Sequence, residues 1–111
     1  HTLLITDACF GGSIFKTRSV EATILQFNQL YKDNSRKALT SGNLTEVPDK
    51  SVFVKYLIKE LEENEDLFLS SAKLFTRMYE PIVNNAPTIP QYGVIQGAGD
   101  EGGDFIFIRR N

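Results

Sequence analysis

An uninterrupted apolar run near the start of the chain constrains the fold more than any other feature. Residues 2–6 read Thr-Leu-Leu-Ile-Thr, so large apolar side chains follow one another without alternating with polar ones. This pattern is typical of a strand buried on both faces, as in a parallel sheet covered by helices. The run ends in Asp7-Ala8-Cys9-Phe10-Gly11-Gly12, where two glycines indicate a tight turn or a close approach of another group to the backbone.

Strand-like and helix-like segments alternate along the rest of the chain, which predicts an α/β domain over residues 1–111. Short strands are expected over 37–40, 92–95 and 105–108. A loop over 13–21 precedes a short amphipathic helix, whose inner face would carry Ile24, Phe27 and Tyr31.

Two further helices are expected in the second half of the chain. Asp49 or Ser51 is the predicted N-cap of one helix, which ends near Glu63. The other helix starts near Ser70 or Ser71, and Pro81 is expected to end or kink it. The predicted inner faces carry Val54, Leu57, Ile58 and Leu61 in the first of these helices and Leu74, Phe75, Met78 and Ile82 in the second.

Composition excludes several classes of protein. The 111 residues suffice for one core, and a formal net charge of −2 gives no reason to expect nucleic acid or a membrane as a partner. A single cysteine and a single histidine cannot supply a zinc site of the usual kind, so we expect no metal and no cofactor. A lone thiol suits a reducing compartment, so we expect a cytoplasmic protein. The chain lacks a starting Met and a signal peptide, so we expect a fragment cut inside a domain.

Cys9 is the strongest candidate for a residue with a chemical role. It follows a predicted buried strand at the edge where α/β sheets place their sites. It could also be a small core residue. A phosphatase loop would need arginine six positions later, where the chain has Phe15, and a redox pair would need cysteine in place of Gly12. A nucleophile for acyl transfer, activated by a histidine elsewhere in the fold, remains.

The segment Leu-Leu-Ile-Thr-Asp-Ala-Cys-Phe-Gly-Gly resembles the nucleophile segment of the caspase and metacaspase clan of cysteine peptidases, with Asp7 where caspases have Gln. Residues 35–42, 47–49, 90–93 and 102–107 are similar to later segments of bacterial caspase-like proteins. The resemblance implies a mostly parallel caspase-like sheet flanked by helices. This chain would be the C-terminal part of a domain that cleaves peptides or proteins with a Cys–His dyad.

The resemblance also assigns roles to individual residues. Cys9 would be the nucleophile, and its N–H would donate to the oxyanion, with the backbone turned by Gly11. Ser41 and Gly42 would border the substrate groove, where an extended peptide adds as a strand. Asp7, two residues before the nucleophile, would favour Arg or Lys before the scissile bond and disfavour Asp. Its alternative role is to cap the strand end or to pair with a structural cation.

The general base is expected outside this chain. The caspase histidine precedes the cysteine by about 50 residues. The only histidine here is His1, eight positions before Cys9 and roughly 26 Å away along a strand. We therefore expect the isolated chain to be inactive and to need the upstream part of the same domain as its partner. No calcium loop is recognisable, although some metacaspases are activated by calcium.

Two other features and two rival hypotheses complete the prediction. Lys16 and Arg18 lie in the polar segment after the nucleophile and are expected sites of proteolytic processing.

The literal G-x-G-x-x-G at 97–102 is not a dinucleotide site, because a strand follows it where that motif needs a helix. It is a flexible solvated connection or a border of the active-site cleft. The rivals are a catalytically silent regulatory or scaffold module and an autonomous small α/β binding domain.

Overall fold

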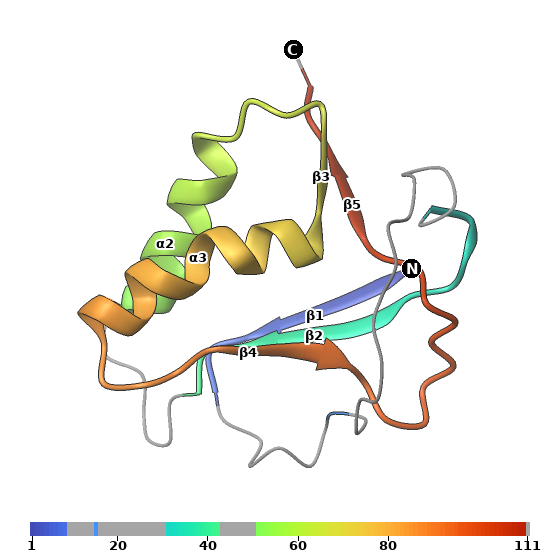
Figure 1. Cartoon of the computed structure of the whole chain (residues 1–111), viewed down its shortest axis with the longest axis horizontal. Helices are drawn as coiled ribbons and strands as arrows, with labels where there is room; N and C mark the ends of the chain where they lie inside the picture. Colours follow the sequence, from blue (N-terminus) through green and yellow to red (C-terminus); the bar gives the residue numbers. More distant parts are fainter. Residues whose placement is uncertain (9–14, 16–30, 43–50, 111) are drawn as a thin grey trace.

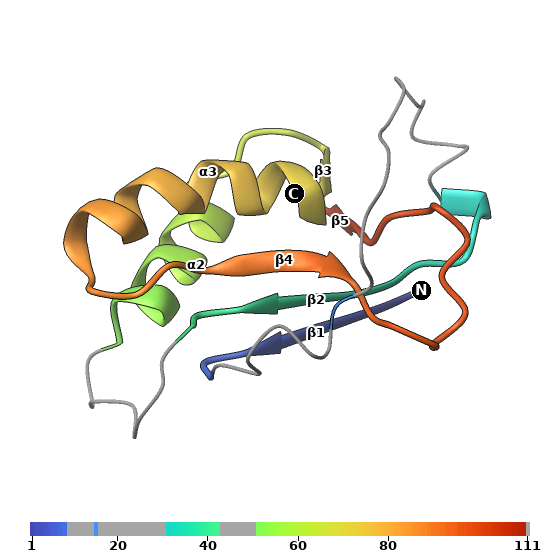
Figure 2. The same cartoon turned by 60° about the horizontal axis from the view of Figure 1, so that its bottom comes forward.

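The computed structural model of the chain describes residues 1–8, 15, 31–42 and 51–110. Their elements form a small mixed α/β fold, which confirms the predicted class. The two long helices that the structure describes lie against one face of a three-stranded sheet, and a separate two-stranded antiparallel sheet extends away from it (Figures 1 and 2). In chain order the elements are β1 (Thr2–Thr6), β2 (Arg36–Thr40), α2 (Val52–Glu62), β3 (Phe68–Ser70), α3 (Ser71–Asn85), β4 (Gln91–Val94) and β5 (Ile106–Ile108).

The main sheet has the order β1-β2-β4 and contains one parallel and one antiparallel pair. β1 and β2 run parallel, with Thr2 opposite Arg36 and Thr6 opposite Thr40. β4 runs antiparallel to β2, so the predicted mostly parallel sheet is not confirmed by the described strands. The parallel pair has a functional consequence, since its two carboxyl ends meet at the same edge of the sheet.

The prediction that β1 is buried on both faces is only half right. Ile5 packs against the core beneath the helices, whereas Leu4, which points to the opposite face, is 40% exposed. Within the described residues, both long helices cover the same face, which is why the two faces of β1 differ (Figure 2). The expected helix with Ile24 and Phe27 lies outside the described residues, and its last predicted member, Tyr31, is exposed.

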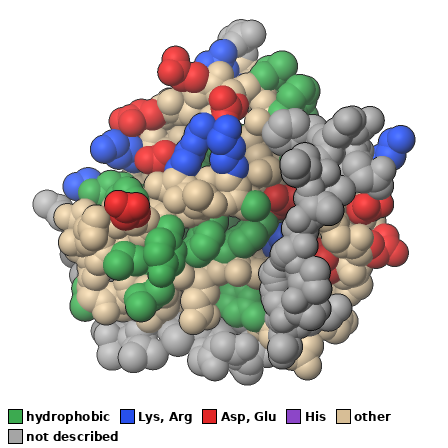
Figure 3. Space-filling view, viewed as in Figure 1, with side chains coloured by type: hydrophobic (Ala, Val, Ile, Leu, Met, Phe, Trp, Pro, Cys, Tyr) green, Lys and Arg blue, Asp and Glu red, His purple; other side chains and the backbone are tan. Residues whose placement is uncertain are grey.

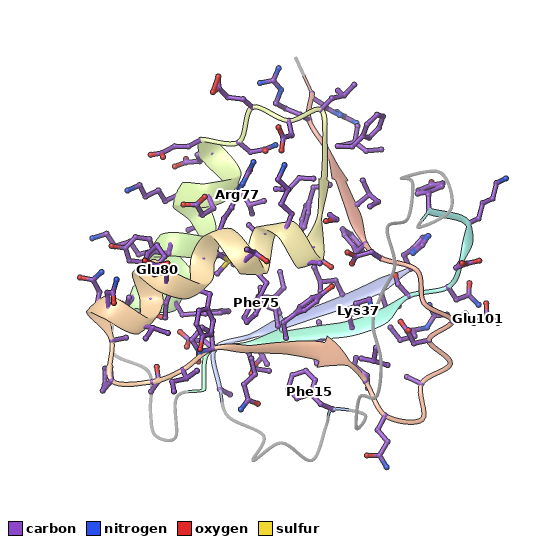
Figure 4. All side chains as sticks on the ribbon, viewed as in Figure 1. Phe15, Lys37, Phe75, Arg77, Glu80 and Glu101 are labelled. Carbon is purple, nitrogen blue, oxygen red and sulfur yellow. The ribbon has the colours of Figure 1, made fainter. Side chains whose placement is uncertain are left out.

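The core lies between the sheet and the two helices. Phe75 projects from α3 toward the sheet (Figure 4) and stacks on Tyr92 of β4, with the ring centroids 5.4 Å apart. This stacking joins the helical layer to the antiparallel edge of the sheet. The buried members of the core are Leu39, Phe53, Leu69, Leu74, Met78 and Ile82.

Helix α2 begins as predicted but presents a different face to the core. Ser51 is the N-cap, and its hydroxyl accepts a hydrogen bond from the Val54 N–H over 3.2 Å. Phe53 is the buried residue, and of the predicted inner face only Leu57 packs against the core. Val54, Ile58 and Leu61 are exposed, so for these three the prediction is wrong. Apolar residues occur almost all round this helix, and the larger Phe53 decides which stripe is buried.

Helix α3 follows the prediction closely, except at its proline. Ser70 caps it, and Leu74, Met78 and Ile82 are fully buried, while Phe75 is half-buried against the core. Pro81 lies inside the helix, which continues to Asn85, so the proline does not end it. The short strand β3, directly before this helix, was not predicted from the sequence. It pairs with β5 from Phe68 opposite Ile108 to Ser70 opposite Ile106.

Candidate active site at the carboxyl ends of β1 and β2

Two backbone hydrogen bonds hold the ends of the parallel strands side by side. The Ser41 N–H donates to the Thr6 carbonyl, and the Gly42 N–H donates to the Ala8 carbonyl, each over 3.1 Å. The strand pairing therefore continues for two residues beyond the last partners in the sheet, Thr6 and Thr40. Residues 6–8 and 41–42 thus form one edge, and this is the edge at which the sequence predicts the site.

Cys9, the predicted nucleophile, lies outside the described residues, as do Gly11, Lys16 and Arg18. Ala8, the residue before Cys9 in the sequence, is the last described residue of this segment and lies at this edge. The structure therefore brings Asp7, Ser41 and Gly42 together next to the start of that segment.

Gly42 occupies a position that only glycine fits without strain. Its φ is +80°, in the left-handed region that L side chains rarely adopt. A Cβ at this position would also lie 2.5 Å from the carbonyl oxygen of Ile89. The next residue of that segment, Pro90, is fully buried, so the contact is with a fixed part of the structure.

Ser41 offers less to a substrate than its place in the sequence suggests. Its side chain is fully buried, and its N–H already donates to Thr6. The Gly42 N–H is likewise used by Ala8. A peptide that adds here as a strand would therefore have to bond to carbonyl groups of Ser41 or Gly42, or to the residues that follow them.

Asp7 is half-buried and lies in a bend just past the end of β1. β1 ends at Thr6, so the regular alternation of side chains along a strand does not extend to Asp7. Proximity in sequence, two residues before the nucleophile, remains as the link between Asp7 and Cys9.

His1 lies at the opposite end of β1, at the first residue of the chain. Its Nδ1 is 2.7 Å from the Ser35 hydroxyl, its Nε2 contacts the Tyr31 carbonyl, and its ring stacks on the Tyr31 ring. The Thr2 N–H donates to the Ser35 carbonyl beside it. This arrangement agrees with the prediction that His1 is not the general base.

The acidic glycine-rich loop lies at the amino end of β2, away from Ser41 and Gly42. Asp100 accepts hydrogen bonds from the Arg36 N–H over 2.7 Å and from the Gly102 N–H over 3.0 Å. The Glu101 N–H donates to the Asn34 carbonyl. The loop is therefore tied to the amino end of β2, whereas Ser41 and Gly42 lie at its carboxyl end, so the described residues give no support to the hypothesis that it borders the predicted site. An open hollow of about 300 Å³ at this end is lined by Val94, Ile95, Gln96, Gly97, Gly99 and Asp100.

A buried polar cluster of Ser71, Tyr92 and Asp104 was missed from the sequence. The Asp104 carboxylate accepts bonds from the Ser71 hydroxyl, from the Tyr92 hydroxyl over 2.9 Å, and from the N–H groups of Ala72 and Phe105 over 3.2 and 2.8 Å. Burial, and then the Asp104 charge, raise the pKa of Tyr92 above its ordinary value.

This cluster is structural and not catalytic. Ser71 is fully buried and has no histidine beside it to take its proton, so it lacks the base that a serine nucleophile needs. The Asp104 carboxylate instead caps the first turn of α3 and joins it to β4 and to the start of β5. The signal in the sequence was an aspartate directly after Gly-Gly, together with serines at the start of a helix.

A charged cluster lies on the surface near the start of α3. Asp66 pairs with Lys73 over 2.8 Å and with Arg77 over 2.9 Å. The Lys73 hydrogen bond lowers the pKa of the Asp66 carboxyl, and the charges of both cations add to this effect. Figure 3 shows Lys and Arg side chains gathered on this face, with Asp and Glu beside them. Lys73 is exposed, while Asp66 and Arg77 are half-buried, and surface ion pairs of this kind contribute little to stability.

Two classes of site are not found in the part of the chain that the structure describes. No group of three or more His, Cys, Asp or Glu side chains there is placed to hold a metal ion. None of the helices described is long and apolar enough to cross a membrane. Comparison of the chain with protein-family models, with curated proteins and with solved structures finds no match.

Proposed function

We propose that this protein is a cysteine endopeptidase of the caspase-like kind, which cleaves peptide bonds after Arg or Lys. One observation carries the proposal: the chain runs from the end of β1 directly into Asp-Ala-Cys-Phe-Gly-Gly, at the edge where the two parallel strands end together. Open α/β sheets bind their ligands at such carboxyl ends. The wider caspase-like sheet, mostly parallel and flanked by helices, belongs to the same proposal.

The chemistry assigned to Cys9 is acyl transfer. Its thiolate attacks the carbonyl carbon of the scissile bond, and the carbonyl oxygen becomes an oxyanion that accepts a hydrogen bond from the Cys9 N–H. The C–N bond then breaks, and the imidazolium of the dyad gives its proton to the departing amine. Water, deprotonated by the same imidazole, attacks the thioester, which releases the carboxylic acid and restores the thiol.

The histidine of this dyad comes from outside residues 1–111. His1 is the only histidine in the sequence, and its ring is held by Ser35 and Tyr31 at the amino end of β1. A general base must approach the thiol to within about 3 Å. The partner in catalysis is therefore another segment of the same domain. The lone thiol suits the cytoplasm, and the Cys–His chemistry needs no cofactor.

The test uses the full-length protein and a peptidyl acyloxymethyl ketone with Arg before the reactive carbon. We expect the compound to alkylate Cys9, as mapped by mass spectrometry, and to abolish hydrolysis of a fluorogenic Arg peptide. Cys9→Ala should fold, since alanine is smaller and apolar, and should have no activity. Ser13→Ala, a substitution in the same segment, is the control and should keep the hydrolysis of the Arg peptide. Full hydrolysis by Cys9→Ala would refute the peptidase, and a folded but inert wild type would favour the scaffold hypothesis.

A further inference from the structure

The short connection from α3 to β4 lies at the end of the sheet where β1 and β2 finish (Figure 1). It begins after Ala86, the C-cap of α3, which packs against the core. It ends where β4 begins at Gln91, the partner of Thr40 in the strand pairing. Residues 87–90 therefore turn at the same edge at which Gly42 follows β2.

The backbone of Ile89, within this connection, is packed against Gly42. A Cβ at Gly42 would lie 2.5 Å from the carbonyl oxygen of Ile89, 3.3 Å from its carbonyl carbon and 3.5 Å from its N. Only a residue without a side chain lets the two backbones come this close. Pro90 is fully buried, and Pro87 and Pro90 each fix one backbone dihedral of the connection. Packing and chain geometry together therefore hold Ile89 beside Gly42.

The side chain of Ile89 is 59% exposed, although its backbone is packed. Of the large apolar residues that the structure describes, only Tyr31, Ile89 and Ile108 are more than half exposed. Tyr31 stacks on His1 at the opposite end of β1, and Ile108 lies in β5, outside the main sheet. Single exposed apolar residues are common on proteins, so it is the place beside the candidate site that distinguishes Ile89.

Ile89, Gly42 and Ala8 form a continuous row at this edge. Gly42 touches the Ile89 backbone, and its N–H donates to the Ala8 carbonyl over 3.1 Å. Ala8 directly precedes the proposed nucleophile in the sequence. An extended peptide advances about 3.3 Å per residue, so a few residues of substrate suffice to reach from Ala8 to Ile89.

We propose that Ile89 is a specificity-determining residue that receives an apolar side chain of the substrate, within three positions before the Arg or Lys; this inference rests on the proposed function. Contact between two apolar side chains removes both from water, whereas a charged side chain would lose water there without gaining a partner. The part of the substrate before the scissile bond stays attached to the enzyme as the thioester until water attacks. Contacts with that part therefore act on both chemical steps.

The test measures kcat/KM of the full-length protein for fluorogenic peptides with Arg before the scissile bond. Val, Ala or Asp is placed, one position at a time, at the three positions before this Arg. At one position the wild type should prefer Val over Ala by about fivefold or more. Ile89→Ser should reduce this ratio to about one, Ile89→Val should keep it, and Ile89→Lys should favour Asp at the same position.

Ile108→Ser is the matched control, because Ile108 is also 59% exposed but lies in β5. It should keep the wild-type ratio of Val to Ala, and circular dichroism should show that all variants fold. An active wild type whose ratios stay the same in Ile89→Ser at all three positions would overturn the role of Ile89 and leave the peptidase standing.

Peptide binding separates the role of Ile89 from the peptidase. Fluorescence anisotropy of labelled peptides with Cys9→Ala should give a lower Kd for the Val peptide than for the Ala peptide, and adding Ile89→Ser should remove the difference. An inert wild type together with this difference in Kd would refute the peptidase alone. Equal Kd values for the two peptides, whatever the activity of the wild type, would overturn the contact with Ile89.

Discussion

The Gly42 N–H donates to the Ala8 carbonyl over 3.1 Å. This bond joins the residue before the predicted nucleophile to the second residue after β2, which is predicted to border the substrate groove. These two residues are 34 positions apart in sequence but adjacent at the carboxyl edge of the sheet. The bond uses the one N–H of Gly42 and the carbonyl that precedes Cys9. It therefore fixes the entrance of the nucleophile segment against the strand that is proposed to receive substrate.

Gly42→Ala should destabilise the fold by about 2 kcal/mol or more, for two physical reasons. The residue has a φ of +80°, and its new Cβ would lie 2.5 Å from the carbonyl oxygen of Ile89. The measurement is the free energy of unfolding in urea. Gly97→Ala is the matched control, since Gly97 has a φ of +73° but nothing within 4 Å of a Cβ. Equal losses in the two variants would show that the contact with Ile89 has no cost.

Asp104→Ala should lower the free energy of unfolding by about 3 kcal/mol, because it leaves buried donors without their acceptor. The carboxylate accepts from the hydroxyls of Ser71 and Tyr92 and from two N–H groups at the starts of α3 and β5. Asp100→Ala is the control, since that carboxylate accepts from two N–H groups and is less buried. Urea unfolding followed by circular dichroism gives both values. A loss at Asp104 no larger than at Asp100 would contradict the assigned role.

The raised pKa of Tyr92 predicts that stability falls in strong base. Burial, and then the charge of Asp104, keep the phenol protonated in the folded state above its ordinary pKa near 10. Below that pH both states hold the proton, whereas above it only the unfolded chain releases it. The free energy of unfolding should therefore fall above pH 10, by up to about 1.4 kcal/mol per pH unit. Tyr92→Phe should remove this part of the slope, and identical slopes in both proteins would contradict the prediction.

The fold class could be predicted from the sequence because local patterns determined most of it. Ser51 as a cap and the buried row Leu74, Met78 and Ile82 follow from spacing alone. The face of α2 could not be predicted in this way, since apolar residues nearly surround that helix and tertiary packing selects Phe53. Strand β3 was missed because three residues carry too little periodicity to distinguish a strand from a loop.

The candidate site was predictable only where its residues are close in sequence. The end of a buried strand and the glycines after it point to Asp7 and Cys9. The contact of Gly42 with Ile89 and the bond from Gly42 to Ala8 join residues far apart along the chain, and no local pattern indicates them. The position of the acidic loop could not be predicted for the same reason, because it depends on the hydrogen bonds from Arg36 to Asp100 and from Glu101 to Asn34.

Processing is predicted after Lys16 or Arg18, in the polar segment that follows Phe15. A protein that cleaves after basic residues should make this cut itself during incubation. N-terminal sequencing of the products should find new ends at Thr17 or Ser19. Cys9→Ala should stay intact alone and be cut when active wild type is added. An active wild type that remains intact after prolonged incubation would contradict processing by the enzyme itself.

Asp7→Asn should weaken the preference for Arg and Lys before the scissile bond. A half-buried carboxylate two residues before the nucleophile favours a cationic substrate side chain, and Arg could bond to both of its oxygens. Asparagine keeps the size and some of the hydrogen bonding, so the fold should survive. With fluorogenic peptides that differ only at this residue, kcat/KM for Arg and Lys should fall by about tenfold or more, and uncharged residues should change little. Asp66→Asn removes a carboxylate paired with Lys73 and Arg77 and should leave the preference unchanged. A wild type that prefers Asp peptides would refute the role of Asp7, because two carboxylates would then have to share one pocket.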